Sequence, residues 1–103
     1  MNKLAIINKG GGRIALVGDM TFATIDKKIA KATAFLASAK EITIDMAGIT
    51  NTDSAGLALM IEWLKYARSK RAHLRFQNVP EQLVTLARLS GFDTADHFKI
   101  HAD

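Results

Sequence analysis

The sequence predicts one α/β domain, spanning residues 1–103, with a mixed sheet of about four or five strands and about three or four helices. Two segments rich in Ile, Leu and Val flank a glycine run near the N-terminus, and strands alternate with helices after them. The composition, 49% hydrophobic and 23% charged, is ordinary for a globular domain. A chain of 103 residues is long enough for one core but not for two.

The first two elements form a predicted β-hairpin. Residues 3–8 and 13–18 are short apolar segments, and three consecutive glycines at 10–12 separate them. A phosphate-binding glycine loop would need a following Lys-Ser/Thr and a helix, whereas a strand follows here. The glycines therefore predict a plain turn.

Residues 24–38 predict a helix with a single apolar stripe. Thr24 or Thr21 would cap it, and Asp26 would lie in the first turn, where acidic side chains are favourable. The stripe recurs at alternating spacings of four and three residues, which is the helical period. Its members are Ile25, Ile29, Ala32, Leu36 and Ala39.

The rest of the chain continues the alternation. Residues 41–49 predict a buried strand, 50–53 a polar turn, 54–69 a helix and 73–77 a short strand. Asn78 as N-cap and Pro80 in the first turn predict a third helix, which Gly91 would end. A last short strand is expected at 98–100.

The informative segment is the start of the helix at residue 54. Thr52, Asp53 and Ser54 lie where a strand ends and a helix begins, beside backbone N–H groups that lack intrahelical partners. Ser54 has two interpretations. It is the N-cap, worth about 1 kcal/mol, or it presents its hydroxyl as a phosphoacceptor or partner contact.

The same helix has an unusually wide apolar arc, of roughly 200° against the ~100° of an ordinary surface helix. One stripe should pack on the sheet: Leu57, Met60, Ile61, Leu64 and Ala67. A second stripe lies beside it: Leu59, Trp63 and Tyr66. Either a neighbouring helix covers this second stripe, or a partner protein does, since Trp and Tyr are favoured in interfaces.

A basic stretch without an intervening acidic residue contributes to the net charge of +4: Lys65, Arg68, Lys70, Arg71 and Arg75. One interpretation is a solvated helix end, where cations complement the helix dipole. The other is attraction to an acidic protein surface or to anionic lipid headgroups. Nucleic acid is not expected, because no aromatic residues interleave with these cations.

Catalytic, metal and cofactor sites are not predicted. The chain has no cysteine, and no spacing of His or Asp typical of metal sites occurs. The nucleophile elbow Gly-x-Ser-x-Gly lacks its first glycine around Ser54. The sequence shows neither a membrane-spanning run nor the apolar region of a signal peptide, so we expect a cytoplasmic protein.

The strand ending Ile-Asp-Met, followed by Thr-Asp-Ser-Ala-Gly-Leu at 52–57, resembles the STAS domain family over nearly the whole chain. That family includes the anti-sigma factor antagonists, whose phosphorylated serine corresponds to Ser54. Thr21 stands where many antagonists carry an Asp. Residues 56–68 and 74–92 are similar to MlaB, the STAS subunit of a bacterial phospholipid ABC transporter.

The resemblance implies a non-enzymatic subunit that docks on an MlaF-like ABC ATPase at the inner membrane and supports its assembly and activity. The candidate partner-binding residues are Thr52, Asp53, Ser54, Ala55, Gly56, Leu59, Trp63 and Tyr66. The small Ala55 and Gly56 would permit close approach of the partner. The alternative is an anti-sigma factor antagonist that is switched at Ser54 by a serine kinase and binds an anti-sigma factor.

Overall fold

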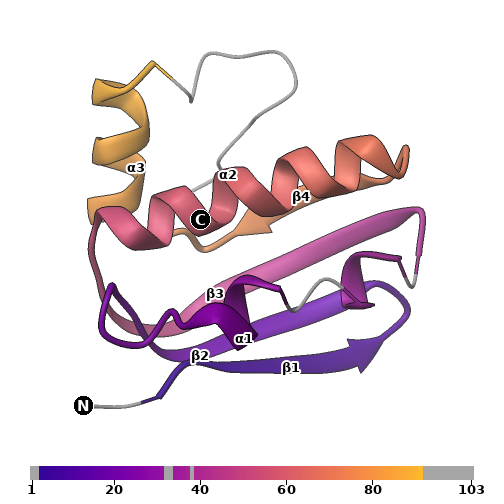
Figure 1. Cartoon of the computed structure of the whole chain (residues 1–103), viewed down its shortest axis with the longest axis horizontal. Coiled ribbons are helices and arrows are strands. Elements are labelled where there is room, and N and C mark those ends of the chain that lie inside the picture. Colours follow the sequence, from indigo (N-terminus) through magenta and orange to yellow (C-terminus); the bar gives the residue numbers. More distant parts are fainter. Residues whose placement is uncertain (1–2, 32–33, 38, 92–103) are drawn as a thin grey trace.

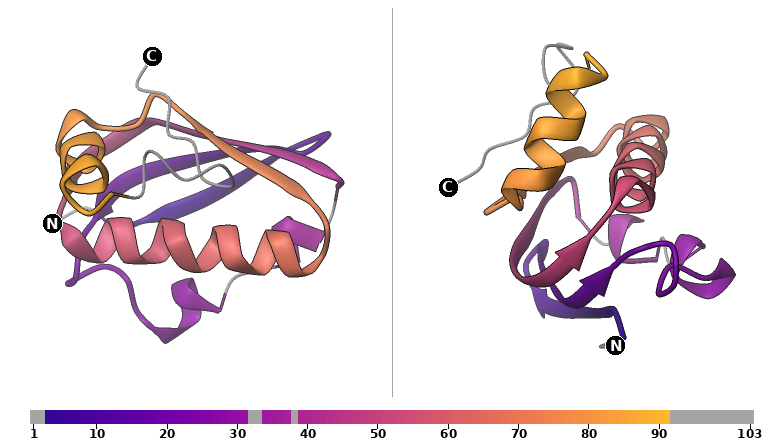
Figure 2. Two further views of the ribbon diagram at one scale, coloured as in Figure 1. Left: turned by 90° about the horizontal axis from the view of Figure 1, so that it is seen from above. Right: turned by 90° about the vertical axis from the view of Figure 1, so that its left-hand side faces the viewer.

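A four-stranded mixed sheet organises the computed structural model, which describes residues 3–31, 34–37 and 39–91. The strand order is β1-β2-β3-β4. The first pair is antiparallel, and β3 runs parallel to both of its neighbours. Figure 1 shows α2 along the sheet with α3 near its start, and Figure 2 shows α1 and α2 on the same face of the sheet. The α/β class and the mixed sheet are thus confirmed.

The predicted hairpin is present as β1 (Ala5–Gly10) and β2 (Arg13–Met20). The turn between them requires glycine at position 12 for two reasons. Gly12 has φ +80°, and a Cβ there would collide with the carbonyl oxygen of Glu41 at the start of β3. The amide of Thr43 donates to the Gly12 carbonyl at 2.8 Å, so the turn packs directly on β3.

The long helix predicted for residues 24–38 is wrong. The structure has a four-residue helix α1 (Lys27–Ala30), capped by Asp26 rather than by a threonine, and a separate 3-10 turn η1 (Ala34–Ala37). The Asp26 carboxylate accepts from the Ile29 amide at 2.9 Å. Two of the five stripe residues are alanines, which give a continuous helix little apolar area to bury, and η1 reaches the core separately through Leu36.

The next strand is longer than its apolar pattern indicates. β3 (Glu41–Thr52) includes residues 50–52 of the predicted polar turn, because Asn51 pairs with Asp19 and Thr52 with Met20. Only Asp53 separates β3 from α2 (Ser54–Ser69). The pairing with β2 holds the polar end of β3 in the sheet, so α2 begins directly at the sheet edge.

The third helix starts differently from its prediction. α3 (Glu81–Leu89) follows β4 (His73–Gln77), and Pro80 occupies its N-cap without a side-chain cap. Asn78 has a left-handed φ of 55° and donates instead to Asp45 at 2.9 Å. Together with the Ala47 amide and the nearby Lys9, this bond lowers the pKa of Asp45. The strand predicted at 98–100 lies outside the described residues.

The core lies between the sheet and α2. Its most deeply buried large side chains come from β2, β3, α2, β4 and α3, with Leu36 from η1. They include Leu16, Ile44, Met60, Trp63, Phe76 and Leu83. Burial of this apolar surface holds α2 rigidly on the sheet. The first turn of α2 is therefore fixed in position relative to the ends of β2 and β3.

Candidate docking site

Asp53 builds the start of α2 and ties it to the loop after β2. Its Oδ1 accepts a hydrogen bond from the Ala55 amide at 2.9 Å, which makes Asp53 the N-cap. The same carboxylate accepts from the Phe22 amide, at 3.2 Å to Oδ1 and 3.1 Å to Oδ2. Residues 22 and 53 are far apart in sequence, so this contact joins two separate chain segments into one surface.

Asp19 is buried below the same surface and accepts hydrogen bonds from the residues around it. It is the one buried charged residue within the described ranges. Its Oδ1 accepts from the Thr50 hydroxyl at 2.6 Å and from the Asn51 side-chain amide at 2.9 Å. Its carbonyl accepts from the Thr24 hydroxyl at 2.8 Å. These bonds connect the ends of β2 and β3 with the following loop, and sequence analysis did not single out Asp19.

Ser54 is the first residue of α2 and is exposed. The N-cap interpretation of Ser54 is wrong, because the Asp53 carboxylate takes that position and a single helix start has one cap. Within the described part of the chain, no hydrogen bond of the Ser54 hydroxyl is found. The Ser54 hydroxyl is therefore presented at a rigid helix start, and it has no structural role there.

Phe22 is the feature of this surface that sequence analysis missed. Its side chain is 84% exposed, the largest exposure among the big apolar residues of the described ranges. The Asp53 carboxylate holds its backbone beside the start of α2. We call the surface formed by Phe22, Asn51 and Ser54 the tip; all three residues are exposed. Phe22 lies next to the Thr-Asp-Ser segment in space but not in sequence, so the sequence pattern does not indicate that the two are neighbours.

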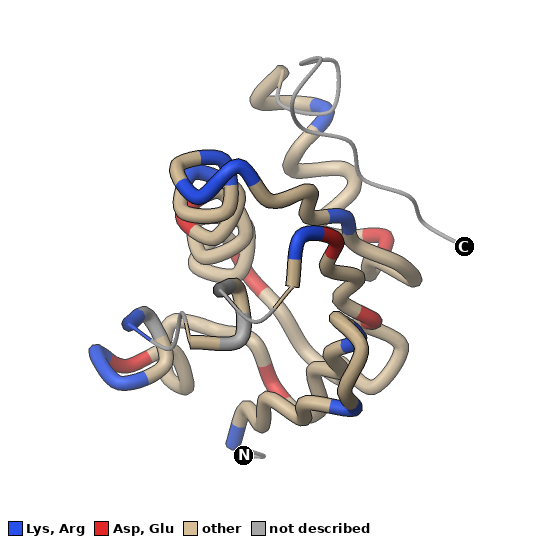
Figure 3. Tube along the Cα trace, turned by 90° about the vertical axis from the view of Figure 1, so that its right-hand side faces the viewer, with Lys and Arg blue, Asp and Glu red and all other residues tan. Residues whose placement is uncertain are grey.

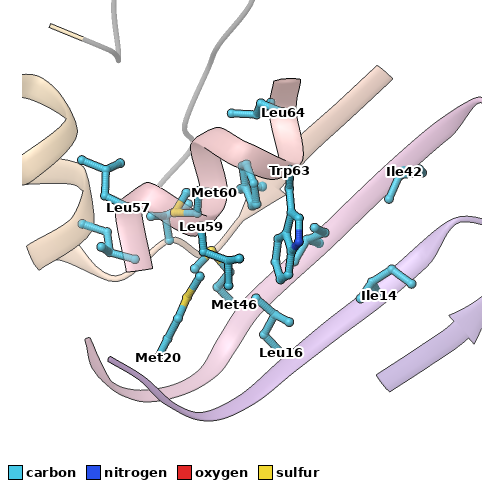
Figure 4. Close-up of a cluster of buried hydrophobic side chains, with 14 of the residues drawn as sticks. Ile14, Leu16, Met20, Ile42, Met46, Leu57, Leu59, Met60, Trp63 and Leu64 are labelled. Carbon is cyan, nitrogen blue, oxygen red and sulfur yellow. The ribbon is translucent and has the colours of Figure 1, made fainter. Parts of the chain in front are cut away.

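Leu59 and Trp63 do not belong to an outer docking stripe, and this part of the prediction needs correction. Leu59 is 3% exposed and Trp63 0% exposed. Figure 4 shows the Trp63 side chain pointing from α2 towards the sheet, where Leu16 and Met46 lie. Apolar side chains of this size are most stable when the chain's own core removes them from water, so they are unavailable to a partner.

Gly56 also has an internal role rather than the predicted one. It is buried, and an added Cβ would lie 2.6 Å from Thr52 Oγ1 and 3.0 Å from the Met20 carbonyl. Its small size lets α2 approach the end of β2, not a partner. Thr52, Asp53 and Ala55 are half-buried at the tip. Tyr66 is half-buried too, with the Lys70 Nζ 5.7 Å from its ring centroid.

Across residues 3–31, 34–37 and 39–91, no group of three or more His, Cys, Asp or Glu is arranged to hold a metal ion. In the same ranges, no helix combines the length and apolar character needed to cross a membrane. A rigid, outward-facing mixture of an aromatic ring, a hydroxyl and an amide fits recognition of another protein surface.

A family model described as "Mlab, STAS domain" matches residues 7–100. The chain belongs to this family of STAS domains. STAS domains are generally binding domains that interact with proteins and do not catalyse reactions. A comparison with curated proteins gave no match.

Solved structures of STAS-like fold resemble this STAS domain at low sequence identity. The unphosphorylated form of the anti-sigma factor antagonist SpoIIAA aligns with a TM-score of 0.66 and 12% identity, over 97% of this chain and 87% of that one. A putative anti-sigma factor antagonist from Thermotoga maritima gives 0.64 and 14%, over 97% and 85%. A sulfate transporter family protein from Wolinella succinogenes gives 0.63 and 15%, over 87% and 75%. At these identities the similarity shows the fold.

Proposed function

We propose that this STAS domain is a non-catalytic subunit that docks through the tip on the cytoplasmic ATPase of a phospholipid ABC transporter. The partner is an MlaF-like ATPase, and binding supports its assembly and activity. The chain would thus be cytoplasmic and peripheral to the inner membrane through the complex. The family match favours this partner over others.

The observation that carries the proposal is the exposed pair Phe22 and Ser54, held together by Asp53. A partner that covers the Phe22 ring would remove its apolar surface from water, and that burial would contribute to binding. Because hydrogen bonds to Asp53 already fix the backbone that carries Phe22 and Ser54, little conformational entropy is lost when a partner binds. Thr52, Asp53 and Ala55 would contribute polar and close contacts around this pair.

The direct test is co-purification of the tagged domain with an MlaF-like ATPase from the same genome. We expect Phe22→Ala to weaken the complex about tenfold, as for a contact worth more than ~1 kcal/mol. Ser54→Glu should weaken it at least as much, because it places a charge in the interface. Ser69→Glu, at the exposed far end of α2, is the control for added charge, and its stability is measured as well because the Ser69 hydroxyl donates to the Tyr66 carbonyl at 2.6 Å. Full binding by both tip variants would overturn the proposal.

The second candidate is an anti-sigma factor antagonist switched by phosphorylation of Ser54. The exposed hydroxyl, relieved of capping by Asp53, favours it. A phosphate at this helix start would lie near the positive end of the helix dipole. Neighbouring genes discriminate: an ATPase, a permease and a periplasmic lipid-binding protein favour transport, whereas a serine kinase and a sigma factor favour the switch. Incubation with the cognate kinase, followed by mass analysis of Ser54, tests the switch directly.

A further inference from the structure

A broad groove of about 880 Å³ lies at the end of the molecule opposite the tip. It is bordered by the C-terminal end of α2, the starts of β3 and β4, and the turn before β2. Leu64, the first α2 residue that lines the groove, follows Ser54 by ten residues, which is about 15 Å along the helix at a rise of 1.5 Å per residue. This groove is therefore distinct from the proposed docking surface.

The groove is strongly cationic. Four arginines line it, from three different parts of the chain, and Glu41 is the only acidic lining residue. The arginines are Arg13, Arg68, Arg71 and Arg75. None of the four forms an ion pair within the part of the chain that the structure describes. Figure 3 looks onto this end and shows Lys and Arg positions at the end of α2 and on neighbouring segments.

Helix-dipole compensation does not account for the whole cluster. Cations near the C-terminus of a helix are favourable, which explains Arg68 in the last turn of α2. Arg13 opens β2 and Arg75 lies inside β4, so neither belongs to that helix end. Arg75 Nε donates to the Thr43 hydroxyl at 3.3 Å, which leaves its other guanidinium donors for a ligand.

The backbone conformation of Arg71 gives a second, independent reason to assign a function to the groove. Arg71 directly follows the cap of α2 and has a left-handed φ of 57°. The amide of Ala72 donates to the Ala67 carbonyl at 2.9 Å, which is the helix-ending arrangement that favours glycine. A residue with a Cβ is strained in this left-handed conformation. The residue in this strained position is nevertheless an arginine, and it lines the groove.

We infer that this groove binds the phosphate group of an anionic ligand. Planar guanidinium groups match phosphate oxygens with paired hydrogen bonds, and several together neutralise its charge. A phospholipid headgroup and a soluble phosphorylated compound share this chemistry. The inference concerns a second site and does not depend on the partner that occupies the tip.

Two probes distinguish the sources. One is co-sedimentation with vesicles containing phosphatidylglycerol in phosphatidylcholine, against vesicles of phosphatidylcholine alone; the other is calorimetric titration with inorganic pyrophosphate. Binding to the anionic vesicles only indicates a headgroup site, and binding of pyrophosphate indicates a soluble ligand. Both results support the inference. Binding of neither probe overturns it.

Variants distinguish binding in the groove from general electrostatic attraction to the basic surface. Arg75→Gln and Arg71→Gly should each weaken binding about tenfold, as expected for one charged hydrogen-bonding group. Lys28→Gln, an exposed cation on α1 outside the groove, removes the same charge and should have little effect. Equal weakening by Lys28→Gln and Arg75→Gln would overturn the inference.

Arg71→Gly adds a readout that folding alone cannot produce. Glycine relieves the left-handed backbone, so chemical denaturation should show unchanged or raised stability while binding falls. If Arg71→Gly keeps full binding, the arginine has no role in the groove and the assignment fails. Should that variant fold poorly, Arg75→Gln against Lys28→Gln still decides the question.

Discussion

The backbone amide of Phe22 donates to both carboxylate oxygens of Asp53, at 3.1 and 3.2 Å, across 31 residues of sequence. The same carboxylate caps α2 through the Ala55 amide. One side chain therefore fixes both the helix start that presents Ser54 and the loop that presents Phe22. The tip is a consequence of this double use of a single aspartate.

Replacing Asp53 by alanine should lower the free energy of unfolding by about 1–2 kcal/mol, because the cap and the Phe22 hydrogen bonds are both lost. Urea denaturation measures this loss. Asp53→Asn keeps an oxygen for the Ala55 amide and should lose less. ATPase binding should fall more in Asp53→Ala than in Ser54→Ala, since the former frees both parts of the tip. Unchanged stability in Asp53→Ala would contradict the double role.

Trp63→Ala should destabilise the domain by about 3–5 kcal/mol, the usual cost of emptying a large buried aromatic site. That loss is comparable with the whole stability of many small domains, so thermal unfolding should show a very low midpoint. Leu89→Ala, at a side chain 80% exposed, is the control and should stay within about 0.5 kcal/mol. Trp63→Phe should remain folded and retain ATPase binding. Specific loss of binding in a well-folded Trp63→Phe variant would argue that the indole contacts the partner.

Gly56→Ala should cost about 1–3 kcal/mol, although alanine is the better helix former, because the new Cβ meets Thr52 Oγ1 and the Met20 carbonyl. The double variant Thr52→Ala/Gly56→Ala should recover part of this loss, since the hydroxyl oxygen is removed and the carbonyl remains. Double-mutant analysis of denaturation curves measures the coupling. Stabilisation by Gly56→Ala alone would show that α2 lies further from β2.

The hydrogen bonds of Asp45 should make the stability of the fold depend on pH in the acidic range. Its folded-state pKa is lowered, first by the Asn78 hydrogen bond. A lowered pKa contributes stability that is fully present above the unfolded value of about 3.9 and is lost as pH falls through the folded value. Asp45→Asn should therefore show a smaller drop in stability than the wild type on going from neutral pH to strongly acidic pH. Asn78→Ala should raise the Asp45 pKa, measured by NMR titration of its carboxyl group. An unchanged titration would remove the proposed cause.

Much of the architecture around the tip follows from local pattern. The glycine run between two apolar segments predicts the hairpin, and the strand-to-helix change at Ser54 correctly locates the start of α2. The helix predicted at 24–38 is wrong, and two of the five residues that satisfy its helical period are small alanines. Periodicity records which positions are apolar, but not how much area a neighbouring element will cover.

The sequence by itself determined the α/β class, the family and the place where a helix opens with Thr-Asp-Ser. Only the tertiary structure decided which side chains face outward. Helical spacing gives α2 a wide apolar arc, but the packing of the sheet against it determines that Trp63 is buried. Phe22 is exposed beside Ser54 because a carboxylate 31 residues away holds its amide. Contacts between distant segments leave no periodic trace in either segment, so they emerge only when the chain folds.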